Sequence, residues 1–149
     1  MELNKFGISP EAGDGVYAPQ PARTFKVDSA VTTAFGPTTA LKLAGVVSNG
    51  LPVVTPITAT SDVPYCIAAT SLRGNSFNGG DKIKAWVSDE VVWLKASAAI
   101  TQGSKVSAAV DGTIAATGEG GVVLGYAESS ASAADDLVAV RITAPYAVL

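Results

Sequence analysis

Histidine is absent from this chain of 149 residues, and cysteine occurs once, as Cys66. The absence of histidine excludes an imidazole base, a Ser–His or Cys–His catalytic pair and histidine metal ligands. A single cysteine excludes an intrachain disulfide framework and cysteine-based zinc or iron–sulfur sites. We therefore expect no cofactor and no metal. Cys66 lies in the short apolar run 64–69, which predicts a buried, unreactive thiol.

Charge is scarce as well. Asp, Glu, Lys and Arg make up 15% of the residues, against a usual share of about 25%. The net charge is −3, so the chain has no broad basic surface for phosphate backbones, and we expect no nucleic-acid partner. No uncharged apolar stretch reaches about 18 residues, so we expect no membrane helix. The N-terminus lacks a basic region followed by an apolar run, and this predicts synthesis in a reducing cytosol.

The acidic residues do not form an obvious catalytic arrangement. Asp89-Glu90 and Asp135-Asp136 are neighbours in the chain, and neighbours on a strand point to opposite faces. Asp111 stands in a turn, where a carboxylate caps backbone N–H groups. We therefore expect that this protein is not an enzyme. A glycosidase-type pair of carboxylates from distant positions is the enzymatic alternative.

Two glycine-bearing motifs lack the residues that their functions would require. The run 118–121 does not precede a helix with Lys-Ser/Thr, so it does not predict a phosphate-binding loop. The stretch 103–114 has the pattern of a lipoyl or biotinyl carrier hairpin. Its tip, 110–112, lacks the lysine to which such a group is attached.

The first 37 residues differ from the remainder by their many prolines and glycines, which disfavour long hydrogen-bonded ladders. Aromatic residues are nevertheless spaced through this segment, unlike in a disordered linker. We interpret residues 1–37 as an extended arm that folds over its own body or over a neighbour. A long loop packed on its own domain is the alternative. The aromatic anchors of the arm are Phe6, Tyr17, Phe25 and Phe35.

From residue 38 to 149 the sequence is typical of short strands, with β-branched and small residues between turn signals. Asn49-Gly50 and Asp111-Gly112 are strong hairpin signals, and Pro56 favours an edge strand. The fold class is all-β: a small β-sandwich or β-barrel of short antiparallel strands, with an extended N-terminal arm. The expected strands are 39–47, 53–58, 65–70, 82–88, 90–95, 105–108, 113–116, 121–127 and 137–142.

Alternation within these strands predicts which residues face the core. Leu41, Leu43 and Val47 share one face of the strand 39–47. In 82–88, Ile83, Ala85 and Val87 share one face, which places Trp86 on the other. The strand 90–95, which carries Trp93, is expected to form a hairpin with 82–88.

An outward Trp86 is either covered by the arm or buried in an interface with a partner. The alternative is that Trp86 caps the end of its own barrel. The residues expected to bind a partner are Phe6, Tyr17, Phe25, Phe35, Trp86 and Trp93.

Several of these strands, taken together, carry a family resemblance. The stretches 81–100, 103–106, 111–113, 123–127 and 135–142 resemble the structural cement (capsid decoration) proteins of tailed bacteriophages. The resemblance implies an oligomeric capsid-surface protein that joins the expanded head. Such a protein clamps the major capsid protein against the pressure of the internal DNA. The family has no catalytic residues to carry over.

The sequence analysis therefore predicts a bacteriophage capsid decoration protein on the exterior of the virion, made in the host cytoplasm. Its expected partners are the major capsid protein and further copies of itself, as a homotrimer or, as second choice, a homodimer. The isoelectric point of about 4.8 suits an outer surface better than one that faces DNA. The alternative function is a host-surface or glycan-binding β-module with Trp86, Tyr126 or Tyr17 as a stacking platform.

Overall fold

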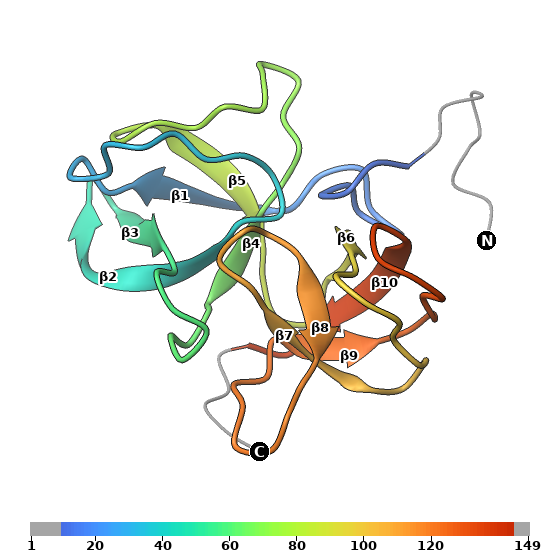
Figure 1. Cartoon of the computed structure of the whole chain (residues 1–149). Coiled ribbons are helices and arrows are strands. Elements are labelled where there is room, and N and C mark those ends of the chain that lie inside the picture. The colour runs from blue at the N-terminus through green and yellow to red at the C-terminus, as the bar shows by residue number, and fades with distance from the viewer. Residues whose placement is uncertain (1–9, 145–149) are drawn as a thin grey trace.

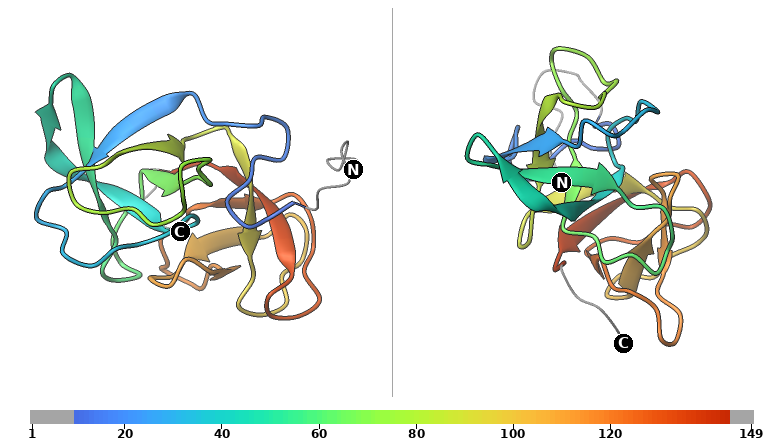
Figure 2. Two further views of the ribbon diagram at one scale, coloured as in Figure 1. Left: turned by 90° about the horizontal axis from the view of Figure 1, so that it is seen from above. Right: turned by 90° about the vertical axis from the view of Figure 1, so that its left-hand side faces the viewer.

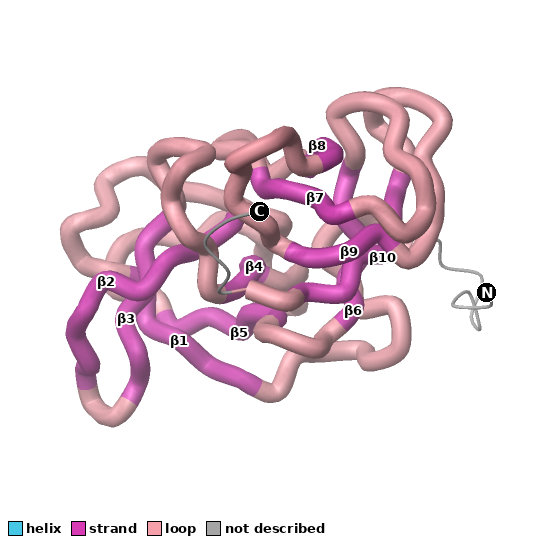
Figure 3. The backbone as a smooth tube through the Cα atoms, turned by 90° about the horizontal axis from the view of Figure 1, so that it is seen from below, coloured by secondary structure: helices cyan, strands magenta, loops and turns pink. Residues whose placement is uncertain are grey.

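The computed structural model describes residues 10–144, and in that range the chain forms strands and loops without a helix (Figure 3). The predicted all-β class is confirmed. Ten strands form two sheets. The strands are β1 Arg23–Val27, β2 Ala40–Ser48, β3 Leu51–Pro56, β4 Cys66–Ala68, β5 Lys82–Trp86, β6 Val91–Lys95, β7 Lys105–Ala108, β8 Ile114–Ala116, β9 Gly125–Ala127 and β10 Leu137–Ile142.

The first sheet is a closed barrel in the order β1-β3-β2-β4-β5, which occupies the left half of Figure 1. The barrel closes through antiparallel pairing of β1 with β5, and β1 runs parallel to β3. Asn49 and Gly50 adopt positive φ values of 53° and 80°, which is the backbone of the predicted β2–β3 hairpin turn. The buried residues of the barrel interior are Phe25, Val27, Leu41, Val54, Cys66, Ala68, Phe77, Ile83 and Ala85.

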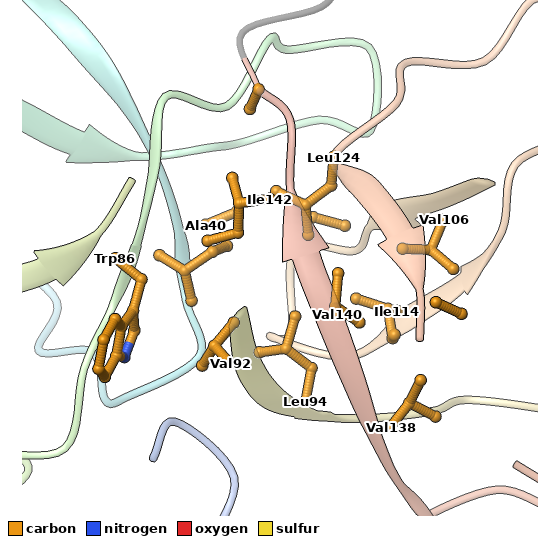
Figure 4. Packing of buried hydrophobic residues seen from close by; sticks show 14 of the residues in the cluster. Ala40, Trp86, Val92, Leu94, Val106, Ile114, Leu124, Val138, Val140 and Ile142 are labelled. Carbon is orange, nitrogen blue, oxygen red and sulfur yellow. The ribbon is translucent and has the colours of Figure 1, made fainter. Parts of the chain in front are cut away.

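The second sheet has the order β6-β10-β9-β7-β8. The predicted hairpin at Asp111-Gly112 is confirmed as β7–β8. A bridge between Ala96, just after β6, and Ile114, at the start of β8, brings the two edges of this sheet together. The sheet therefore curls around its own apolar residues. Its core cluster also contains Ala40, Ile67 and Trp86 from barrel strands, so the two sheets share one core (Figure 4).

The expected arm needs correction at its boundary. Residues 23–27 are the barrel strand β1, which is paired on both sides, so they belong to the body. The preceding segment runs along the free edge of β6: Gly13 N–H donates to the Trp93 carbonyl at 2.7 Å, and Val16 N–H donates to the Val91 carbonyl at 3.0 Å. This pairing covers an edge that would otherwise present unpaired backbone groups. Residues 1–9, which include Phe6, lie outside the described residues.

The expected hairpin between 82–88 and 90–95 does not form. β5 pairs with β1 and β4 inside the barrel, while β6 pairs with β10 in the second sheet. The Ser88-Asp89 turn, with φ of 74° at Asp89, therefore passes the chain from one sheet to the other. The predicted turn is present, but the partners of the two strands are set by the closure of the barrel.

The prediction that Pro56 marks an edge strand is also wrong. β3 lies between β1 and β2 in the closed barrel. Its pairing with β1 ends at Val54, two residues before Pro56, so the missing N–H removes no bond to β1. Pro56 is tolerated because it is the last residue of an interior strand.

Candidate interaction surface

Trp86 joins the two sheets. In β5, Ile83 and Ala85 point into the barrel as the alternation predicts, and Trp86 points out of it. Trp86 is nevertheless buried, because it enters the core of the second sheet beside Val92 (Figure 4). Its indole Nε1–H donates a hydrogen bond to the Gly13 carbonyl oxygen at 2.9 Å. The N-terminal segment thus covers Trp86, so this side chain is not available to a partner.

Glycine is required where the N-terminal segment crosses the indole. A Cβ atom on Gly15 would overlap the Ala18 carbonyl oxygen and approach the Trp86 ring atom Cζ2 to 2.9 Å. Gly13 has a φ of +97°, a conformation that side-chain-bearing residues rarely adopt. Gly15 therefore lets the backbone lie against the ring, and Gly13 supplies the carbonyl oxygen that accepts the indole hydrogen bond.

Phe25 and Phe35 pack within the body. Phe25 is fully buried in the barrel, with the Arg23 guanidinium 5.0 Å from its ring centroid and Tyr65 in an edge-on contact. Phe35 is half-buried, and its ring meets Phe77 at 5.6 Å. Their backbones also exchange two hydrogen bonds, so this pair joins the loop before β2 to the loop before β5. Phe25 therefore offers no surface to a partner, and Phe35 is only partly exposed.

Tyr17 and Trp93 both keep part of their side chain exposed to solvent. Tyr17 is 70% exposed, which makes it the most accessible of the predicted partner-binding residues in the described range. Trp93 is half-buried on the face of β6 opposite to Val92 and Leu94, and its Nε1 is enclosed without a hydrogen-bond partner. The structure therefore does not bring the predicted aromatic residues together into one surface.

The exposed apolar residues of the β2–β3 hairpin were not among the predicted site residues. Leu43, Val46 and Val47 are 48%, 60% and 70% exposed. Leu41 alone of the predicted inward face is buried, because β4 pairs only with Ala40 and Leu41, and β2 then continues past the barrel. A bulge between Leu43 and Val47 also shifts the register. These exposed residues lie on the β2–β3 hairpin, whose strands are labelled in Figure 1.

A groove of about 690 Å³ lies between the N-terminal segment, the loop after β4 and the outer side of β5. The two carboxylates in its lining are Glu11 and Asp14, and Lys82, Lys84 and Arg73 line it as well. Asp14 accepts hydrogen bonds from the Thr70 hydroxyl at 2.6 Å and from the Glu11 backbone N–H at 2.9 Å. Asp14 therefore serves to hold the segment against the loop.

Several acidic side chains act as loop caps. Backbone N–H donation from Thr58, followed by the hydrogen bond from Lys42, lowers the pKa of Asp62 to about 2. The hydrogen bonds from Ser132 lower the pKa of Asp136, and those from Thr113 lower the pKa of Asp111. The prediction that Asp111 caps its turn is confirmed. In each case the ionised carboxylate organises backbone in its own loop.

Cys66 is buried inside the barrel, as predicted, and burial raises the pKa of its thiol. Among residues 10–144, no three His, Cys, Asp or Glu side chains are grouped so that they could hold a metal ion. In the same range, no helix is long and apolar enough to cross a membrane.

Comparison with known proteins finds a similarity of structure and none of sequence family. No family model and no curated protein sequence matches this chain. The chain is similar in structure to the N base of head fibre gp8.5 of bacteriophage phi29, solved by crystallography. The TM-score is 0.54 at 18% identity, and the match covers 80% of this chain and 91% of that chain. At this identity the similarity establishes a shared fold.

Proposed function

We propose that this protein is a structural component of a bacteriophage head that binds the outer surface of the capsid lattice as a decoration protein. The observation that carries the proposal is the fold shared with the base of a phage head fibre, over nearly the whole of that base. The resemblance of several strand segments to capsid cement proteins independently supports a role on a bacteriophage head. Association with further copies of the chain, as a homotrimer or homodimer, belongs to the proposal.

The physical properties of the described residues suit this role. The two sheets share one core, and the N-terminal segment holds them together through β6 and Trp86. A body braced in this way can transmit load without a large loss of conformational entropy on binding. A protein that contacts several capsid subunits at once turns weak individual contacts into strong attachment.

Binding to heads tests the proposal directly. The purified chain is mixed with expanded, undecorated heads of its phage and sedimented, and we expect it to pellet with the heads up to a fixed stoichiometry. Unexpanded heads are the matched control and should bind less. Absence of co-sedimentation at any ratio would contradict the proposal.

A role for the N-terminus in head binding is tested separately. Removing residues 1–9 leaves every described contact in place, so the variant isolates the contribution of that segment, including Phe6. We expect weaker head binding with an unchanged unfolding transition. Equal binding by the shortened chain would limit the function to the body.

A glycan-binding module is the other function to test. Burial of Trp86 removes it as a stacking platform, which leaves the exposed Tyr17 and Tyr126. Specific retention on a glycan array, lost on substitution of Tyr17 or Tyr126 by Ala, would favour that function over capsid decoration.

A further inference from the structure

The groove beside β5 gathers positive charge on a protein that is acidic as a whole. Arg73, Lys82 and Lys84 line the groove, while the net charge of the chain is −3. Neither of the two ion pairs found among residues 10–144 includes any of these three cations. The loop after β4, which carries Arg73, rises above β5 in Figure 1 and in the right-hand view of Figure 2. A partner that enters between them meets cations that hold no carboxylate of the described residues.

The two carboxylates in the lining, Glu11 and Asp14, leave this charge uncompensated. Both oxygens of Asp14 are engaged, one by the Thr70 hydroxyl at 2.6 Å and the other by the Glu11 backbone N–H at 2.9 Å. The Glu11 side chain is exposed and takes part in neither of the ion pairs of the described range. Three cations therefore stand against two carboxylates, and the groove is positive overall.

The stability of the barrel does not explain the two lysines of the groove. Lys82 and Lys84 are exposed on the outer side of β5, because the residue between them faces the barrel interior. In the antiparallel register, Lys82 stands directly opposite Lys26 of β1. Like charges in directly opposite positions destabilise a sheet. The arrangement costs stability in the isolated barrel, and an anionic group bound beside it would reduce that cost.

The groove is already formed before any partner binds. The hydrogen bond from Thr70 to Asp14 joins the N-terminal segment to the loop after β4. Within this loop, Ser71 N–H donates to the Asn75 side-chain oxygen at 2.9 Å, and Arg73 N–H donates to the Ser71 hydroxyl at 3.1 Å. A partner therefore does not have to order these segments, which lowers the entropic cost of binding.

The spacing of the lysines fits an extended partner. Residues two apart on one strand, such as Lys82 and Lys84, are separated by about 7 Å, and alternate residues of an extended peptide have the same spacing. β5 is paired with β1 on one side and with β4 on the other, so it has no free edge to which a strand could be added. Recognition at this place is therefore by side chains. The planar guanidinium of Arg73 can bind a carboxylate through two hydrogen bonds.

We propose that this groove binds an extended acidic segment of the major capsid protein, in which carboxylates alternate along the chain. Lys82 and Lys84 pair with two of these carboxylates, and Arg73 pairs with a third. Glu11 repels the bound segment and limits its affinity. The inference rests on the proposed function, since it names the chemistry that a decoration protein of this kind recognises on the capsid.

Fluorescence polarisation with the purified full chain tests the inference. The probe is a labelled peptide with the central sequence Asp-Ala-Asp-Val-Asp, and its control is the same peptide with Asn in place of each Asp. We expect saturable binding of the Asp peptide, weakened at least about fivefold as the salt concentration rises from about 50 mM to about 500 mM. Equal affinity for the two peptides, or no binding of either, would overturn the inference.

Charge variants locate the binding site. Lys82→Gln/Lys84→Gln should weaken binding of the Asp peptide about three- to tenfold, because two opposite charges are lost. Glu11→Gln should strengthen it about twofold, because a like charge is removed. The matched control is Lys95→Gln/Lys105→Gln, which changes the net charge equally on strands β6 and β7, outside the groove. An equal loss in the two double variants would reveal a general charge effect and contradict the proposed site.

A single-stranded oligonucleotide of the same net charge as the Asp peptide is the second ligand to compare. We expect it to bind more weakly, because its phosphates lack the alternating spacing of carboxylates on an extended chain. Binding as tight as that of the peptide would show that the groove attracts any polyanion, and the proposed recognition would be wrong.

Head binding separates a failure of this inference from a failure of the proposed function. Lys82→Gln/Lys84→Gln should bind expanded heads less tightly than wild type, and the Asp peptide should compete with wild type for them. If wild type and this variant bind heads equally, the inference alone fails. If the groove binds the Asp peptide but the wild-type chain binds no heads, the capsid function fails, whereas recognition of acidic peptides by the groove stands.

Discussion

The indole Nε1 of Trp86 lies 2.9 Å from the carbonyl oxygen of Gly13, a residue 73 positions earlier in the chain. This hydrogen bond joins the last residue of a barrel strand to a segment that lies along the edge of the second sheet. The two sheets and the N-terminal segment are therefore expected to unfold together rather than one after another.

Trp86→Phe removes the donor but keeps an aromatic ring. The Gly13 carbonyl loses a buried partner, which costs about 1–3 kcal/mol of unfolding free energy, and the smaller ring leaves space in the shared core. Urea denaturation followed by circular dichroism measures the loss. Tyr17→Phe, at an exposed site, is the control; a Trp86→Phe chain as stable as wild type would contradict the role given to this bond.

Gly15→Ala is expected to destabilise the chain by at least about 1–3 kcal/mol, because overpacking displaces the segment from the indole. The matched control is Gly118→Ala, since a Cβ atom there meets open space. Thermal unfolding of both variants separates a steric effect from a general preference for glycine. Equal melting temperatures would show that the segment does not press on Trp86.

Asp62→Asn tests the loop cap on the β3–β4 connection. The pKa of Asp62 is lowered from 3.8 to about 2 in the folded protein, so its ionised form is favoured by folding. Its contribution is fully present above pH 4 or so and is lost as the pH falls towards about 2. Wild type should therefore lose more stability than Asp62→Asn across this window. Parallel acid-dependence curves for the two proteins would contradict the prediction.

We expect the Cys66 thiol to be unreactive towards alkylating reagents in the native state. Its thiol is buried, and burial raises its pKa, so the reactive thiolate forms only when the barrel opens. We expect iodoacetamide to modify the chain at a rate set by unfolding, and to modify it rapidly in denaturant. Rapid labelling under native conditions would show that the barrel opens locally around β4.

Deletion of residues 1–30 is expected to prevent folding. The deletion removes β1, which closes the barrel through β3 and β5, and with it the fully buried Phe25. Deletion of residues 1–9 keeps all of these contacts and is the matched control. Circular dichroism and one-dimensional NMR distinguish the two; a folded chain that lacks residues 1–30 would show that β1 is dispensable.

The alternation within single strands was sufficient to predict several orientations. Ile83 and Ala85 lie inside the barrel and Trp86 lies outside it, as the period of two requires. The same pattern marks β1, where the buried Phe25 and Val27 alternate with the less buried Thr24 and Lys26. The prolines and glycines around this strand mask the signal, because their local preference disfavours a long ladder.

Pairing partners were less predictable. The strands 82–88 and 90–95 read as a hairpin, yet each pairs within a different sheet. Alternation predicts Leu43 and Val47 as core residues. However, β2 is longer than its neighbour β4, so these two side chains lie beyond the paired region and are exposed. Both errors have one cause: local patterns specify that a strand forms, while the neighbour that covers it is chosen by non-local contacts.

The amino-acid sequence by itself determined the all-β class, the two hairpin turns, the buried Cys66 and the lack of histidine or disulfide chemistry, because these depend on composition and on short-range backbone preferences. Only the tertiary structure decided that Trp86 is covered by the segment around Gly13 and Gly15, that Phe25 belongs to the barrel, and that Leu43 and Val47 are exposed on the β2–β3 hairpin. These outcomes depend on barrel closure and on contacts between distant segments, which no local pattern encodes.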